Sequence, residues 1–415
     1  MHSFDVLIIG AGPAGIAAAI AARKSGVKVG VVDDNLTAGG QIWRGAVPRK
    51  WTDAFLNSGA HLLAGTRIFD APQRGLLLAK TLESWIELRY ERLILATGAR
   101  ELFLPFPGWT LPNIMGAGGL QAMVKGGLDI AGKRVVVAGS GPLLIAVAAS
   151  LHKHGAKLQA IVEQAFLSSQ TRFAASILSQ PSKAWQGAKL LWTLHGVPMR
   201  HGAYPVRAEG DGRVRSVTLS NGAKVDCDYL ACGFGLVPNT ELASLLGCRL
   251  NGHFVEADEA QQTSVASVYA AGEITGIGGL EKSLVEGTIA AYRATGNLAA
   301  ARSLDRQRKT THTFQRTMDV AFALRPELFK LANEATKVCR CEDVTLGALE
   351  PFNSWREAKL HTRCGMGPCQ GRICGPILRG VKGWRDEGVR PPIFPVDVAA
   401  LVQTSGVQTS GVQAR

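Results

Sequence analysis

The N-terminal part of the chain alternates short apolar, β-branched runs with an alanine-rich helical stretch. The runs are DVLIIG at residues 5–10, VKVGVVD at 27–33 and RLILATG at 92–98. Such alternation predicts strands joined by helices, and therefore βαβ units with a parallel sheet. The same order of strand, turn, helix and strand recurs between Arg134 and Glu163. The pattern thus predicts two nucleotide-type folds in tandem.

A late segment, Val268 to Gly296, contains one strand, a glycine-rich turn and a helix. Because it lacks the two strands that another such fold would need, we expect it to complete the first one. The predicted domains are a first nucleotide fold at 1–112 and 249–300, a second at 113–248, a basic helical connector at 301–336, a small cysteine-rich module at 337–385 and an extension at 386–415. The extension repeats QTSGV at 403–407 and 408–412 without an apolar face, so its tail is predicted to be disordered.

Composition narrows the class of protein. The 415 residues are 46% apolar and 19% charged, which is typical of a soluble globular chain and excludes disorder and collagen. The net charge of +13 is scattered and accompanies no nucleic-acid-binding motif, so we interpret it as a solvated surface and expect no nucleic-acid partner. The apolar stretch from Val6 to Ala22 has no basic segment before it and is broken by glycines, which argues against a signal peptide or a transmembrane segment.

The first glycine turn is the clearest nucleotide-binding motif. Gly10, Gly12 and Gly15 fit G-x-G-x-x-G directly after a strand and before a helix, and Asp33 ends the next strand. Gly10 permits the tight turn, Gly12 admits a pyrophosphate and Gly15 allows close packing of helix on strand, while Asp33 would bind ribose hydroxyls. Two other apolar strands also end at glycine and would place ligand-binding groups at the same sheet edge. The candidate residues of this site are Gly10, Gly12, Pro13, Ala14, Gly15, Asp33, Thr97, Gly98, Gly272 and Glu273.

The second glycine turn is weaker. Gly139 and Gly141 occupy the first two positions of the fingerprint, but the third is Leu144, whose bulk would push the helix from the strand. Glu163 ends the following strand and would favour a ribose over a 2′-phosphate. Three interpretations stay open: a working NAD(H) site, a relict or adenine-nucleotide site, or a scaffold without ligand.

Cysteines supply the most specific signal. Five of the eight lie between Cys339 and Cys374, which indicates metal chemistry in a reducing compartment more than a disulfide scaffold. Four thiolates complete the coordination of one [2Fe-2S] cluster. Zinc is the alternative, although C-x-C is a less usual zinc half-site than C-x2-C. Cys227 and Cys232 lie in an apolar run and are predicted to be core residues, and His361 is predicted to be a surface residue.

These motifs resemble known proteins. GAGPAG, ATGAR and GEITG resemble the two-dinucleotide-domain flavoprotein disulfide reductase superfamily, in which the first site holds FAD and an Asp usually stands where this chain has Glu273. GGQIWR resembles that family's flavin-side loop, which implies roles for Gly40, Gln41 and Arg44; an ordinary turn followed by a buried Trp43 is the alternative. With no C-x-x-C pair at the family's redox positions, thioredoxin reductase chemistry is excluded.

The spacing C-x-C-x27-C-x4-C resembles the module of bacterioferritin-associated ferredoxin, in its form fused to flavoproteins. That resemblance implies the cluster ligands Cys339, Cys341, Cys369 and Cys374, with Cys364 as a neighbour. The implied fold class is α/β, with two nested Rossmann-like domains of the flavoprotein disulfide reductase type and a small helical [2Fe-2S]-binding C-terminal domain.

Over residues 4 to about 400 the chain resembles the FAD-containing subunits of opine oxidases, hydrogen cyanide synthase, and proline, D-hydroxyproline and sarcosine dehydrogenases. The resemblance implies a cytoplasmic electron-transfer subunit, with peripheral contact with the inner membrane also open. It would work beside an amino-acid-oxidase-like flavoprotein that oxidises the C–N bond of an amino or imino acid. A small ferredoxin-like [2Fe-2S] subunit and an FMN at a subunit interface are compatible with this interpretation. The alternatives are a self-contained NAD(P)H-dependent flavin and iron–sulfur reductase, or a cluster-bearing scaffold or sensor that holds flavin only structurally.

Overall fold

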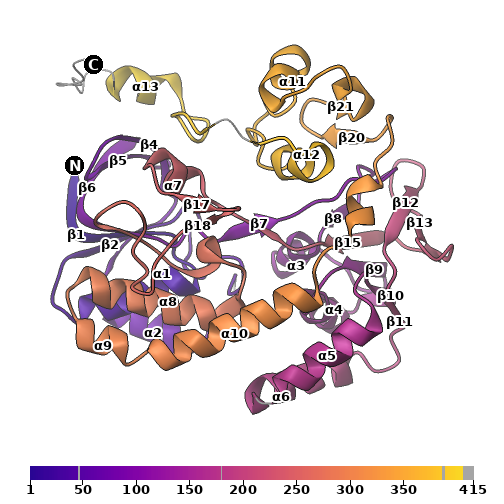
Figure 1. Cartoon of the computed structure of the whole chain (residues 1–415), viewed down its shortest axis with the longest axis horizontal. Coiled ribbons are helices and arrows are strands. Elements are labelled where there is room, and N and C mark those ends of the chain that lie inside the picture. The colour runs from indigo at the N-terminus through magenta and orange to yellow at the C-terminus, as the bar shows by residue number, and fades with distance from the viewer. Residues whose placement is uncertain (45–46, 179, 386–387, 405–415) are drawn as a thin grey trace. The chain divides into compact units, whose positions relative to one another are not determined.

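The computed structural model describes residues 1–44, 47–178, 180–385 and 388–404 (Figure 1). The predicted disordered tail at 405–415 therefore lies outside the described residues. The chain forms two compact units, one comprising residues 1–98, 238–309 and 388–415, the other residues 99–237 and 310–387. The domain boundaries proposed from the sequence remain predictions. Among the described helices, none has both the length and the apolar composition needed to span a bilayer.

The first unit is built on a mostly parallel sheet with strand order β3-β2-β1-β6-β5-β4, to which β19 adds beside β6. β19 runs parallel to β6, so the late strand belongs to the first sheet, while β4 and β5 form antiparallel pairs. Its elements are β1 (His2–Ile9), α1 (Pro13–Arg23), β2 (Val29–Val32), α2 (Arg49–Asn57), β3 (His61–Leu63), β4 (Arg67–Gln73), β5 (Leu76–Lys80), β6 (Trp85–Leu95), α7 (Glu241–Leu245), β17 (Leu250–Asn251), β18 (Phe254–Val255), β19 (Val268–Ala270), η1 (Gly272–Thr275), α8 (Gly279–Ala294), α9 (Leu298–Arg302) and α13 (Val398–Thr404).

Helices α1 and α8 pack tightly together on one face of this sheet (Figure 1). The alanines of α1 and Gly287 of α8 explain the close approach, since a Cβ at Gly287 would lie 2.1 Å from the carbonyl oxygen of Ala14. Leu7, Leu93 and Ile274 belong to a separate apolar cluster. Strands buried on both faces form continuous apolar runs, as β1 does. The strands that lead to the first glycine turn are therefore packed in apolar clusters.

The second unit contains a parallel sheet of order β11-β10-β9-β15-β8 and an antiparallel one of order β12-β13-β14. The elements wholly inside it are β7 (Ala99–Glu101), β8 (Ile114–Gly116), α3 (Ala117–Lys125), β9 (Arg134–Gly139), α4 (Leu143–Lys153), β10 (Lys157–Glu163), α5 (Leu167–Ile177), α6 (Pro181–Thr193), β11 (Met199–His201), β12 (Pro205–Glu209), β13 (Ser216–Leu219), β14 (Lys224–Asp226), β15 (Tyr229–Gly233), η2 (Pro326–Lys330), β20 (Lys337–Cys339), β21 (Val344–Thr345), η3 (Gly347–Leu349), α11 (Trp355–Thr362) and α12 (Cys374–Lys382). β16 (Leu236–Pro238) and α10 (Asp305–Ala321) pass from one unit to the other.

The cysteine-rich segment does not form a separate core. Its buried residues Val338, Cys339 and Leu378 belong to the same apolar cluster as Val136 of β9 and Leu230 of β15. The Trp109 indole N–H also donates to the carbonyl oxygen of Lys337 at 2.7 Å. The cysteine-rich segment therefore shares its interior with the second nucleotide fold, and the separate helical domain at 337–385 stays a prediction.

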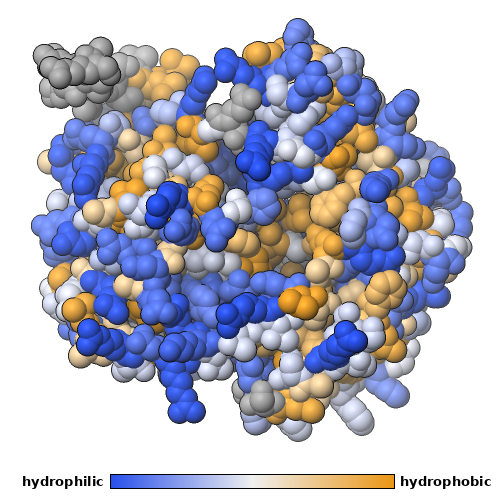
Figure 2. Space-filling model, viewed as in Figure 1, coloured by the Kyte–Doolittle hydropathy of each residue, from blue (hydrophilic) through white to orange (hydrophobic). Residues whose placement is uncertain are grey.

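Helix α6 leaves large apolar side chains uncovered. Trp185 and Trp192 are 74% and 83% exposed, and Leu178 before the helix is 72% exposed. Figure 2 shows orange apolar residues among blue ones toward the bottom of the view, where α6 lies in Figure 1.

Candidate functional site

The first glycine turn has the geometry that its sequence predicts. Gly10 has φ of +106°, and a Cβ there would lie 2.2 Å from the carbonyl oxygen of Ala96; a Cβ at Gly15 would lie 1.8 Å from that of Gly10. At Gly12 a Cβ would meet only the Cα of Gly40, at 3.9 Å, among the described residues. Packing within the protein therefore requires Gly10 and Gly15, whereas the described residues leave the space beside Gly12 unfilled. Pro13 and Ala14 open α1 directly after it.

Asp33 stands at the end of β2 and faces this turn. Its buried carboxylate accepts hydrogen bonds from the backbone N–H of Ala11 and, at 2.8 Å, from that of Asn35. Arg44 donates to the Asn35 side-chain oxygen at 3.3 Å. The carboxylate is thus fixed at the position that a ribose would approach.

The loop at residues 39–44 packs on the same turn. The Gly39 N–H donates to the carbonyl oxygen of Ala11 at 2.8 Å, and Gly40 has φ of +57°. Trp43 is buried and lies against Trp51 with ring centroids 5.9 Å apart, which fits both a flavin-side loop and an ordinary turn. Gln41 is exposed, and its proximity to a flavin remains a prediction.

At the neighbouring strand end, Thr97 is tied to the chain that returns from the second unit. Its hydroxyl donates to the carbonyl oxygen of Asn239 at 2.7 Å, and the Asn239 amide donates back to the Thr97 carbonyl oxygen at 2.8 Å. The adjacent Gly98 has φ of +65°, and no described residue other than its chain neighbours lies within 4 Å of where its Cβ would stand. The hydroxyl and the carbonyl oxygen of Thr97 are therefore both bonded to Asn239.

The η1 loop, which follows β19, holds Gly272 and Glu273. The Glu273 carboxylate accepts from the N–H groups of Gly278 and Gly279 at 3.0 and 2.9 Å, at the start of α8. Burial raises the pKa of this carboxyl. The loop therefore carries its acid close to the helix N-terminus, where backbone donors are available to an anion.

A buried ion pair fixes this loop from beneath. The Lys282 ammonium donates to the Glu286 carboxylate at 3.0 Å, to the carbonyl oxygens of Gly272 and Gly276 at 3.1 and 3.0 Å, and to the Thr275 hydroxyl at 2.8 Å. Glu286 also accepts from the Gly272 N–H at 2.9 Å. The two charged side chains are 1% and 0% exposed.

The second glycine turn folds although Leu144 replaces the third glycine. Leu144 is buried, and its Cδ2 lies 3.1 Å from where a Cβ on Gly233 would stand. The glycine in the neighbouring strand β15 thus makes room for the leucine. Glu163 accepts from the N–H groups of Gly141 and Ala165 at 2.7 and 2.9 Å. Burial raises the pKa of Glu163 to about 7.

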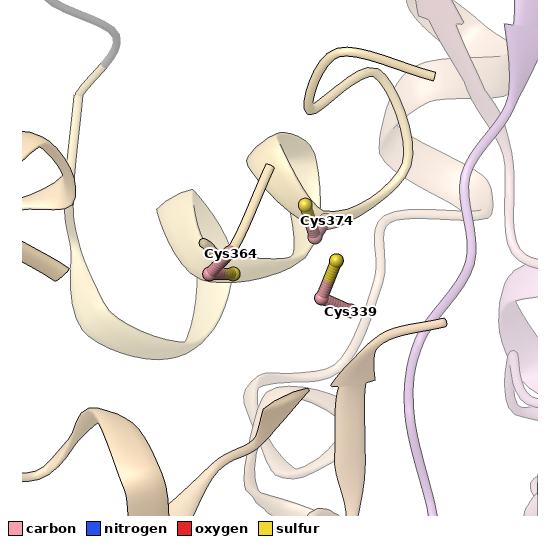
Figure 3. Close-up of side chains that lie close together, drawn as sticks. All are labelled: Cys339, Cys364 and Cys374. Atoms are coloured by element: carbon pink, nitrogen blue, oxygen red, sulfur yellow. The ribbon is translucent and has the colours of Figure 1, made fainter. Parts of the chain in front are cut away.

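The cysteine module holds three thiols in one group and two more in a pair. The sulfurs of Cys339, Cys364 and Cys374 lie within 4.8 Å of one another, and Figure 3 shows the three side chains close together, at the end of β20, in the loop after α11 and at the start of α12. The Cys341 and Cys369 sulfurs are 3.8 Å apart. Two sulfurs on one tetrahedral metal, with bonds of about 2.3 Å, would stand at about that separation.

The structure groups cysteines that the sequence interpretation divided into ligands and a neighbour. Cys339 and Cys374 lie with Cys364, which the sequence interpretation set aside as a neighbour, and Cys341 and Cys369 form a separate pair. Hydrogen bonds from Cys364 and Cys374 lower the pKa of Cys339, which favours a thiolate there. The donor set fits a thiolate-bound metal cluster.

Several glycines of this module are required by close packing. A Cβ at Gly365, Gly371 or Gly375 would lie 2.9 to 3.0 Å from the ring of Trp355. At Gly367 it would lie 2.3 Å from the Cβ of Cys341. The glycine-rich run therefore lets the cysteine loop fold against one buried tryptophan.

Sequence reasoning missed several of these residues. The i, i+4 spacing of Lys282 and Glu286 was a usable signal for an ion pair, but nothing in the sequence showed that both would be buried. Trp355 and Asn239 carried no motif. Cys227 and Cys232, by contrast, are buried as predicted, and burial raises the pKa of Cys227 to about 12.

Known proteins place this architecture in a family. The pyridine nucleotide-disulphide oxidoreductase family matches residues 4–295. The chain belongs to this family. It is 31% identical to the hydrogen cyanide synthase subunit HcnB of Pseudomonas aeruginosa, with 98% of this chain and 99% of that protein covered. Identity to one of the opine oxidase subunits of Rhizobium meliloti is also 31%, over 97% of this chain and 100% of the relative. The family resemblance is confirmed, and the chain is an oxidoreductase whose full-length relatives are subunits of multisubunit enzymes.

Solved structures share the fold. An L-proline dehydrogenase from P. horikoshii superposes with a TM-score of 0.70 at 19% identity, covering 96% of this chain and 79% of that one. A thioredoxin reductase from T. acidophilum gives a TM-score of 0.55 at 21% identity, covering 72% and 100%. These matches confirm the Rossmann-like, flavoprotein disulfide reductase type of architecture.

Proposed function

We propose that this chain is the FAD- and [2Fe-2S]-containing electron-transfer subunit of a heteromeric dehydrogenase that oxidises the C–N bond of an amino or imino acid. The observation that carries the proposal is one module that holds a group of three cysteine sulfurs and a pair of two more, in a chain whose N-terminal fold presents an open glycine turn. Family membership supports flavin-dependent electron transfer, and the subunit names of the full-length relatives support a partner subunit.

The residues of the first unit fit FAD. Gly12 leaves the approach to the turn free, the N-terminus of α1 offers backbone donors to a pyrophosphate, and Asp33 is held ready for a ribose. Glu273 follows β19 of the same sheet, and Gly40 lies beside Gly12. Bound FAD would accept the electron pair released by C–N oxidation, and a cluster would take electrons singly. This chain's residues supply position and polarity.

For the cluster we propose Cys339, Cys341, Cys369 and Cys374 as ligands. The 3.8 Å pair of Cys341 and Cys369 suits one metal, and two of the three grouped thiols suit the other. Of those three, Cys339 and Cys374 complete the spacing typical of the ferredoxin-like module, which leaves Cys364 beside the cluster. Zinc would need only one metal and no sulfide, so inorganic sulfide distinguishes the two.

The test is to tag the chain in its native cells, purify it anaerobically, and identify the proteins that accompany it. We expect an amino-acid-oxidase-like flavoprotein, a flavin absorption spectrum, about two iron and two sulfide per chain, and a reduced-cluster electron paramagnetic resonance signal. The complex should reduce a dye with a proline-, opine- or glycine-type substrate, while the isolated chain should not. Turnover of such a substrate by the isolated chain, or a colourless protein without sulfide, would overturn the proposal.

A further inference from the structure

The chain that leaves α10 lies over the second glycine turn. The Ser140 hydroxyl, inside the turn, donates to the carbonyl oxygen of Phe322 at 2.9 Å. At Gly141, where a pyrophosphate would approach the backbone, a Cβ would meet the Phe322 side chain, with Cγ at 3.8 Å. In Figure 1 the orange segment after α10 passes beside α4 and α5. The place left open at Gly12 in the first fold is therefore covered at Gly141 in the second.

A buried amide binds the same segment at the end of β10. Gln164 is fully buried and follows Glu163, so it stands beside the expected ribose position. Its side-chain N–H groups donate to the Ser140 hydroxyl and to the Ala323 carbonyl oxygen, each at 3.0 Å, and its oxygen accepts from the Arg325 N–H at 3.3 Å. A buried amide whose groups are all paired holds its partners in one arrangement.

Aromatic and cationic contacts anchor both ends of the segment. The Phe322 ring meets Phe173 of α5 edge-on, with centroids 5.1 Å apart. Arg325 lies over the rings of Phe166 and Tyr204, at 4.7 and 5.0 Å from their centroids, and donates to the Gly202 carbonyl oxygen at 3.0 Å. Residues 322–325, which we call the strap, are thus held at each end and in the middle by the fold that they cover.

We propose that the strap occupies the dinucleotide position of the second fold and excludes nicotinamide and adenine nucleotides, so that these residues determine which electron donors the protein accepts. Of the interpretations open for Gly139, Gly141 and Glu163, this selects the one without a ligand. A nucleotide could bind only after the strap has left, so its apparent dissociation constant is the intrinsic one divided by the fraction of open molecules. The inference rests on the second fold alone and does not require the proposed cluster or partner.

The test measures nucleotide binding directly on the full chain, by saturation-transfer NMR with NADH, NAD⁺, ADP-ribose or ATP at millimolar concentration. Because FAD in the first site has its own adenosine, binding is also followed by hydrogen exchange in peptides covering 139–144 and 163–166. The wild-type chain should show no transfer to any of the four probes, no protection of these peptides, and no bleaching of the flavin by NADH within milliseconds. Any of these signals in the wild-type chain would overturn the inference.

The opened variant is Phe322→Ala/Arg325→Ala, with Trp192→Ala as a control that removes an exposed aromatic side chain from the same unit. In the opened variant, faster hydrogen exchange at 322–325 should accompany ADP-ribose binding at least tenfold tighter than in the wild type. The control should match the wild type. A variant that exchanges faster at the strap, keeps its circular dichroism spectrum and still binds no probe would show that something other than the strap excludes nucleotides. If the double variant does not fold, Ser140→Ala/Gln164→Leu loosens the same contacts from the opposite side and is judged by the same criteria.

Discussion

Replacing Lys282 by Met tests the buried ion pair beneath the η1 loop. The substitution keeps a long unbranched side chain but removes the charge, which leaves the Glu286 carboxylate 0% exposed without its cation. It also removes the donor shared by the Gly272 and Gly276 carbonyl oxygens. Removing one partner of a buried pair costs about 3–5 kcal/mol, since an uncompensated charge stays in the interior. We therefore expect Lys282→Met to lower the free energy of unfolding of the first unit by about that amount.

The matched control is the exposed pair of the same unit, Arg249 and Glu256, 3.3 Å apart with side chains 71% and 49% exposed. Exposed pairs contribute about 0–1 kcal/mol, so Arg249→Met should change little. Urea unfolding followed by circular dichroism, with hydrogen exchange of α8 peptides, gives both values. Lys282→Met/Glu286→Gln should lose less than the sum of its single variants, because Gln keeps an acceptor but no buried charge. A Lys282→Met loss no larger than that of Arg249→Met, or strict additivity in the double variant, would refute the argument.

Three further predictions concern the pH dependence of stability, the first glycine turn and the cysteine ligands. The pKa of Glu163 in the folded protein, about 7, lies above its ordinary value of 4.5, so the folded protein binds more protons than the unfolded chain between these pH values. The free energy of unfolding should therefore decrease by up to about 3 kcal/mol as the pH rises from about 4.5 to about 7. Urea midpoints measured across this range should show a smaller pH dependence in Glu163→Gln. Gly15→Ala should destabilise the chain strongly in thermal unfolding, since its Cβ would lie 1.8 Å from a backbone oxygen. Gly12→Ala should fold but lose at least tenfold in FAD affinity, measured by fluorescence titration. Equal losses of stability in the two variants would contradict the interpretation of the space beside Gly12 as a ligand site. Cys369→Ser should lose iron, sulfide and the visible cluster spectrum, while Cys364→Ala should retain them, and loss in the second variant would make Cys364 a ligand.

Much of the fold could be predicted because local patterns carry it. Apolar runs that end in glycine marked β1, β6, β9 and β19, and the first glycine fingerprint located the turn whose packing needs Gly10 and Gly15. The sequence also showed that the cysteines between 339 and 374 belong to one module. Backbone sterics and side-chain burial decide these features within a few residues, so a linear pattern is enough.

Contacts between distant segments were decided only in three dimensions. The burial of Lys282 with Glu286, the position of Cys364 beside Cys339 and Cys374, the room that Gly233 makes for Leu144, and the strap over Gly141 all depend on chain segments that meet after folding. From its own sequence the second glycine turn could be a nucleotide site or a scaffold, since the motif specifies a backbone shape and not what fills the space beside it. Which atoms fill that space is set by packing across the unit, where Phe322 lies 181 positions from Gly141 in the printed sequence (322 − 141).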